Sequence, residues 1–102
     1  MIQKKENYDN VDVILKKIRI QNKLDFYLSS KSIYVKEDIQ EILEYFIVSL
    51  YNLGKEDVKY LNGIDIVQST INKLNSNSNF DMCIDNMLWR LWEEVNENNS
   101  RS

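Results

Sequence analysis

Residues 35–54 read VKEDIQEILEYFIVSLYNLG, and they hold the clearest structural pattern in the chain. Their apolar positions recur at intervals of three and four residues, which is the period of an α-helix and not of a strand. The acidic side chains fall mostly in the first half, near the positive end of the helix dipole. Gly54 is the residue type that commonly follows the last turn of a helix, so it favours the end of this helix. We therefore predict a helix over 35–53 with a buried face formed by Val35, Ile39, Ile42, Leu43, Phe46, Ile47, Leu50 and Tyr51.

The same period recurs on both sides of this stretch. We expect helices over 11–28, 64–74 and 80–96, and a short helical turn over 55–62 that ends in a break at Gly63. Either Asp9 or Asn10 would cap the first helix, and Asn79, the last residue of a polar loop over 75–79, would cap the final one. The expected buried positions are Val11, Leu15, Ile18, Leu24, Leu28, Val58, Leu61, Ile64, Val67, Ile71, Leu74, Phe80, Ile84, Met87, Leu88, Leu91, Trp92 and Val95.

These elements predict a single all-α domain. A chain of 102 residues with 43% hydrophobic and 28% charged residues can build one modest core without disulfide or metal support. We expect a compact bundle of four to five helices over residues 11–96. A flexible segment over 1–10 would precede it, and a flexible tail over 97–102 would follow it.

The residue inventory argues against catalysis. The chain has no histidine, two glycines and one cysteine, so the usual general base, a glycine-rich phosphate loop and a cysteine metal cluster are all missing. Cys83 stands among apolar residues and is read as a small buried side chain in preference to a reactive thiol. The neighbouring carboxylates Glu37-Asp38 and Glu93-Glu94 fit a solvated helix face better than an acid–base pair, which needs an apolar pocket. We expect no enzyme activity, cofactor, metal or small-molecule ligand, and an unusual carboxylate site is the least favoured function.

The N-terminal segment, the length of the apolar runs and the net charge indicate the cellular location. The polar segment Met1–Asn10 does not resemble a secretion signal, and the apolar runs are too short to cross a membrane. A net charge of −3 is unlike that of a general nucleic-acid or anionic-membrane binder. We therefore predict a cytoplasmic protein that is not a general nucleic-acid or membrane binder, with a local basic patch as the open alternative.

Charged and aromatic residues supply candidate interface positions. Six cations and one carboxylate lie between Ile14 and Lys36, whereas one cation and five carboxylates lie between Phe80 and Glu97. On a continuous helix, Lys16, Arg19 and Lys23 would share one face. This basic ridge either meets an acidic partner or a phosphate backbone, or is simply solvated. The aromatic candidates either border the core or anchor an interface; they are Tyr45, Tyr51, Trp89 and Trp92.

Residues 74–91, LNSNSNFDMCIDNMLWRL, resemble the closing segment of the delta-prime subunit family of the bacterial DNA polymerase III clamp loader. In that family a helix ends in leucine, an Asn-x-Asn turn follows, and a final helix carries an apolar position, an acid and a leucine-rich run. The matching residues here are Asn77, Asn79, Met82, Asp85, Met87, Leu88 and Leu91.

Further upstream, residues 42–50 resemble the family's aromatic-rich helix, so the resemblance covers about the last two-thirds of the chain. Ile47-Val48 replaces the Arg-Asp pair that often follows those aromatics, and the role of that pair therefore does not carry over.

The resemblance implies a C-terminal collar domain, a helical bundle that joins its neighbours in a ring and holds the five-subunit loader together. The whole machine loads the sliding clamp at the expense of ATP bound elsewhere, so nucleic acid would be met only indirectly. The implied partners are the collar domains of the other loader subunits. The alternative is a free-standing small helical regulator or interaction protein, of a phage or antitoxin type.

Overall fold

The computed structural model describes residues 2–31, 36–76 and 78–96, and within these ranges every regular element is helical. This confirms the predicted all-α bundle. In the described part of the chain, five α-helices and one short 3₁₀-helix follow one another. They are α1 (Ile2–Lys17), α2 (Lys23–Lys31), η1 (Lys36–Asp38), α3 (Ile39–Gly54), α4 (Lys59–Asn75) and α5 (Phe80–Asn96).

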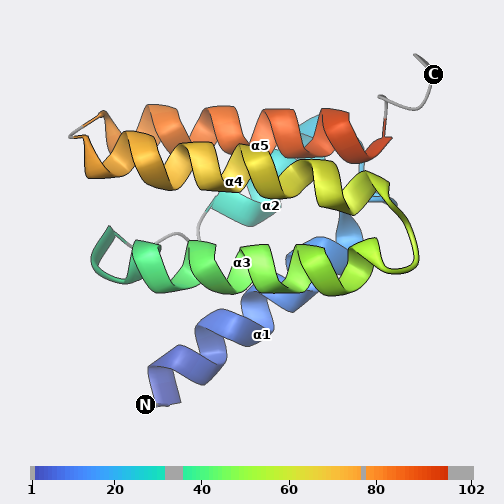
Figure 1. The fold of residues 1–102 in the computed structure, drawn as a ribbon, viewed down its shortest axis with the longest axis horizontal. Helices are drawn as coiled ribbons and strands as arrows, with labels where there is room; N and C mark the ends of the chain where they lie inside the picture. Colours follow the sequence, from blue (N-terminus) through green and yellow to red (C-terminus); the bar gives the residue numbers. More distant parts are fainter. Residues whose placement is uncertain (1, 32–35, 77, 97–102) are drawn as a thin grey trace.

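Helices α3, α4 and α5 form the main body of the bundle (Figure 1). Short connections join them, so consecutive helices run antiparallel and pack along their lengths. Helix α1 crosses α3 on one side, and α2 packs against α5 behind the plane of Figure 1. No helix among the described residues is both long and apolar enough to cross a bilayer.

One hydrophobic core joins all five α-helices. Each contributes at least one side chain that is fully shielded from solvent, namely Val11, Phe26, Phe46, Val67 and Leu88. The apolar stripe of the final helix is buried or half-buried throughout, as its period predicted, and α5 has the predicted bounds. The stripe of α3 is buried or half-buried except at Tyr51, which is exposed. Val35 lies outside the described residues, and α3 begins at Ile39 after η1.

The predicted first helix is wrong in both its start and its length. Helix α1 begins at Ile2, within the segment predicted to be flexible, so neither Asp9 nor Asn10 is its cap. It ends at Lys17, and the backbone oxygen of Lys17 accepts hydrogen bonds from both Ile20 and Gln21. The flexible tail predicted for 97–102 lies outside the described residues.

Side chains of α5 stabilise the break between α1 and α2. Helix ends leave carbonyl groups without partners in the helix. Here Asn96 donates from Nδ2 to the Ile18 oxygen at 2.9 Å, and Trp92 donates from Nε1 to the Gln21 oxygen at 2.9 Å. Asn22 then starts α2, because its Oδ1 accepts a hydrogen bond from the Asp25 amide at 2.8 Å.

Gly63 does not break a helix, contrary to the prediction. It lies inside α4, which continues through the predicted break and starts at Lys59. A Cβ at position 63 would stand 2.9 Å from Leu91 Cδ2 and 3.4 Å from Leu50 Cδ1. The missing side chain therefore permits close packing of α4 on α3 and α5. Val58, predicted to face inward, precedes α4 and is exposed.

Asn79 caps α5 as predicted. Its Oδ1 accepts a hydrogen bond from the Met82 amide at 2.9 Å, which satisfies a donor that the first helical turn leaves free. Its turn partner in the family resemblance, Asn77, lies outside the described residues.

We expect the Asn79→Ala substitution to lower the free energy of unfolding by about 1 kcal/mol, because the Met82 amide loses its acceptor. Urea denaturation followed by circular dichroism measures this loss. Asn86→Ala, which changes an exposed asparagine of the same helix, is the control and should leave the midpoint nearly unchanged. Equal losses in the two variants would contradict the capping role.

Candidate interaction surfaces

The two tryptophans of α5 lie at the seam between α2 and α5. The ring of Trp89 stacks on Tyr27, with centroids 4.8 Å apart and an angle of 10° between the planes. Lys23 Nζ lies 5.6 Å from the Trp89 ring and 5.8 Å from the Trp92 ring, and it also pairs with Glu93. These contacts hold α2 on the bundle, so three predicted interface residues make contacts within the molecule.

A second set of polar contacts closes the same seam. The Tyr27 hydroxyl donates to Asp85 Oδ1 at 2.8 Å and accepts from Lys31 Nζ at 3.0 Å. Lys31 Nζ also lies 3.4 Å from Asp85 Oδ1. The hydrogen bond to Tyr27, followed by that to Asp85, raises the pKa of Lys31. Asp85, the acid that the family resemblance singles out, thus ties α5 to α2.

Tyr45 is half-buried between α1 and α3. Its ring stacks on Tyr8 with a centroid distance of 4.3 Å, and its hydroxyl lies 3.1 Å from both carboxylate oxygens of Asp12. Burial raises the pKa of Tyr45, the hydrogen bond with Ser49 lowers it and the Asp12 carboxylate raises it. Tyr45 therefore fastens α1 to α3.

The predicted basic ridge does not form on one helix. The break at residues 18–22 separates the three cations of the ridge. Lys16 is in the last turn of α1, Arg19 follows that helix, and Lys23 begins α2. Arg19 pairs with Asp57 at 2.7 Å, which raises the Arg19 pKa. The Lys59 amide and then Arg19 lower the pKa of the Asp57 carboxylate.

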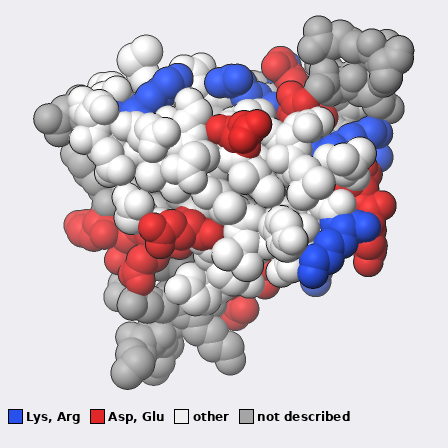
Figure 2. All heavy atoms as spheres, in the orientation of Figure 1, with Lys and Arg blue, Asp and Glu red and all other residues white. Residues whose placement is uncertain are grey.

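Figure 2 shows the charge on the face formed by α3, α4 and α5. Acidic side chains gather over the start of α3, where Glu37, Glu41 and Glu44 lie, and the centre of the face is largely uncharged. Val48 and Tyr51 of α3 are exposed, and Lys55 Nζ lies 5.4 Å from the Tyr51 ring centroid. Tyr51 is thus a predicted interface residue that remains accessible.

Two leucines of α2 and an isoleucine just before this helix are exposed, and the sequence prediction missed this set. Leu24 and Leu28 lie one helical turn apart, and they are 56% and 60% exposed. Ile20, in the turn before α2, is 80% exposed. We call these three residues the α2 outer face. The prediction placed both leucines in the core, whereas Phe26 is the α2 residue buried there.

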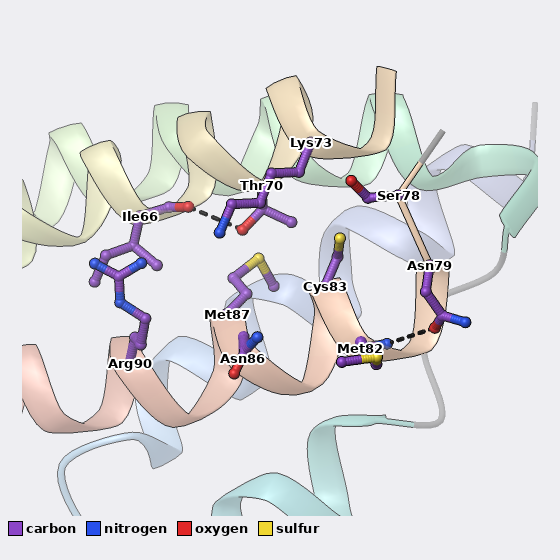
Figure 3. A pocket seen from close by; sticks show the side chains of 10 residues that line it. All are labelled: Ile66, Thr70, Lys73, Ser78, Asn79, Met82, Cys83, Asn86, Met87 and Arg90. Atoms are coloured by element: carbon purple, nitrogen blue, oxygen red, sulfur yellow. Dashed lines mark hydrogen bonds between the residues drawn. The ribbon is translucent and has the colours of Figure 1, made fainter. Parts of the chain in front are cut away.

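A groove that could hold a ligand lies on the bundle, and the acidic and cysteine side chains are the candidate metal ligands. A groove between α4 and α5 is lined by Ile66, Thr70 and Lys73 from α4 and by Met82, Cys83, Asn86, Met87 and Arg90 from α5, together with Ser78 and Asn79 (Figure 3). Cys83 is buried, as predicted. Among the described residues, no cluster of three acidic or cysteine side chains is placed to hold a metal ion.

The chain was compared with models of protein families, with curated proteins and with solved structures, and none of them matches it. The clamp-loader resemblance therefore rests on the residues quoted above.

Proposed function

We propose that this chain is a protein-binding helical domain whose α2 outer face packs against a neighbouring protein. The observation that carries this proposal is the exposure of Ile20, Leu24 and Leu28 within nine consecutive residues, whereas the other exposed large apolar side chains of the described residues are spread over α1, α3, α5 and the α3–α4 connection. Apolar side chains gathered on a surface favour association, because covering them removes apolar area from water. The seam contacts of Tyr27 and Trp89 support this role, since they fix the orientation of α2 before a partner arrives.

The assembly that we propose is the collar of a bacterial clamp loader. In it this chain would act as the non-catalytic oligomerisation domain of a delta-prime-type subunit. It would help to hold the pentamer together while other subunits use ATP to load the sliding clamp during DNA replication. The sequence of residues 74–91 supports this assignment, as does the all-α architecture, and Asp85 occupies the acid position at a structural seam.

Association with the other loader subunits tests the proposal. The 102-residue chain is mixed with the purified collar domains of the remaining subunits of the same loader, and binding is measured by sedimentation velocity. We expect a complex with a dissociation constant of about 10 μM or lower, equivalent to about −7 kcal/mol or more favourable. A chain that stays unbound at 100 μM would contradict the clamp-loader assignment. A gene whose reading frame lacks an upstream ATPase-like module would instead favour a free-standing regulator.

A further inference from the structure

The groove between α4 and α5 has the dimensions of a single side-chain site. It has a volume of about 170 Å³ and lies between the two helices, with Ser78 and Asn79 at one end (Figure 3). An apolar cavity of about 150 Å³ in another protein takes up a benzene-sized group. The α4–α5 groove can therefore receive one large aliphatic or aromatic side chain, and it is too small for a helix.

The floor of the groove is apolar. Ile66 and Thr70 contribute from α4, Cys83 and Met87 contribute from α5, and all four side chains are buried. The Thr70 hydroxyl donates to the Ile66 carbonyl at 2.9 Å, so this polar group already has a partner (Figure 3). Met87 is unbranched and can adapt its shape to an incoming side chain. The floor thus favours an apolar group over a polar one.

Two cations border the groove. The Lys73 side chain extends from α4 back along the groove toward Ile66, and Arg90 of α5 also lies beside Ile66 (Figure 3). Both side chains are exposed, and neither forms an ion pair with another described residue. The described residues that line the groove include no carboxylate, although the chain as a whole has a net charge of −3. The groove is therefore locally cationic on an acidic protein, and it complements an acidic ligand.

We propose that the α4–α5 groove binds a short acidic segment of a partner protein. One large apolar side chain of that segment enters the groove, and carboxylates before and after it pair with Lys73 and Arg90. Lys73 comes from α4 and Arg90 from α5, so the two cations border the groove from its two walls and can pair with different carboxylates of the segment. None of the described residues that line the groove is aromatic, so they offer single-stranded nucleic acid no stacking platform.

This site is separate from the α2 outer face. Cys83, Asn86 and Arg90 project from a different side of α5 than Asp85, Trp89 and Trp92, which hold α2, whereas Met82 lies between the two sides. The groove proposal therefore does not depend on the clamp-loader assignment. Charge reversal in the groove should leave binding through the α2 outer face intact, and so the two proposals can fail separately.

The test uses the ¹⁵N-labelled chain and a synthetic nonapeptide that has one central leucine, two acidic residues on each side of it, and serine and glycine at its ends. We expect saturable shifts of the amide signals of residues 70–73 and 82–90 during an NMR titration. The double variant Lys73→Glu/Arg90→Glu should weaken binding at least tenfold. The matched double variant Lys16→Glu/Lys55→Glu makes the same change in net charge away from the groove and should alter affinity by less than about threefold.

Three control titrations can overturn the proposal. A peptide with serine in place of the leucine should bind at least fivefold more weakly. Equal binding of the two peptides would show that the leucine side chain does not enter the groove. Inorganic phosphate and a thymidine hexanucleotide are titrated in the same way. If either one shifts the same amide signals with a lower dissociation constant than the peptide, the groove is a phosphate site instead. Absence of groove shifts at 2 mM peptide would also contradict the proposal. Circular dichroism of both double variants confirms that a loss of binding does not reflect unfolding.

Discussion

The Phe46→Ala variant should lose about 3–5 kcal/mol of its free energy of unfolding. Phe46 lies in the middle of α3, its side chain is fully buried, and it belongs to the core cluster shared by all five α-helices. Its truncation removes the transfer free energy of an aromatic ring and leaves a cavity that the surrounding helices fill only in part. A domain of this length has a total stability of about 5–15 kcal/mol, so the variant should be close to unfolding at ambient temperature.

Urea denaturation of Phe46→Ala, followed at 222 nm, measures the loss as a lower midpoint with an unchanged slope. The control is Val48→Ala on the same helix, because Val48 is exposed and its truncation should change stability by no more than about 0.5 kcal/mol. A loss below about 1 kcal/mol in Phe46→Ala would show that the centre of α3 is not packed as described.

The Leu24→Asp/Leu28→Asp variant should weaken association with the collar domains at least 100-fold. Burial of one leucine side chain contributes about 1.5–3 kcal/mol, and each aspartate would also place an unpaired charge in the interface. Two such changes exceed the 2.8 kcal/mol or so that a 100-fold change in affinity requires. Because both leucines are exposed in the free chain, the helical circular dichroism signal should remain.

Val48→Asp/Val58→Asp is the matched control for this variant. It introduces the same two charges at exposed valines outside the α2 outer face, so it should leave the affinity within about threefold. If the control weakened association as much as Leu24→Asp/Leu28→Asp did, the interface would not be specific to α2.

Helices α3 and α5 could be predicted from the sequence, because their apolar stripes, and the cap of α5, are formed by residues within or next to each helix. The stripe of α5 repeats at the helical period over the whole element, and Asn79 supplies its cap from within the neighbouring turn. Residues 39–53 contain a similarly wide apolar face, so α3 was also predictable apart from the position of Tyr51.

The division between α1 and α2 could not be predicted in the same way. Val11, Leu15 and Ile18 continue to Leu24 and Leu28 at spacings that one long helix can accommodate. What stabilises the break is tertiary, namely the hydrogen bonds from Trp92 and Asn96 to carbonyls freed at residues 18–21. The one local signal was Asn22 followed three residues later by Asp25, which is typical of a helix start.

The candidate surfaces depended on that same break. Once α2 is a separate helix, Lys16, Arg19 and Lys23 no longer share a face, and Leu24 and Leu28 turn outward while Phe26 turns inward. Trp89 was a candidate interface residue in the sequence, but its stacking on Tyr27 follows only from the docking of α2. The role of Gly63 could not be predicted either. A glycine fits a helix break and a close helix–helix contact equally well, and only the packing of Leu91 against position 63 distinguishes the two.

The central claim, that this chain binds a protein partner through the α2 outer face, is tested most directly by NMR mapping of the complex. The ¹⁵N-labelled chain is titrated with the unlabelled collar domains of the other loader subunits. We predict that shifts and line broadening concentrate in residues 18–31 and spare the exposed side of α3 around Val48. Formation of a complex with the α2 amides unchanged, or no complex at all, would contradict the claim.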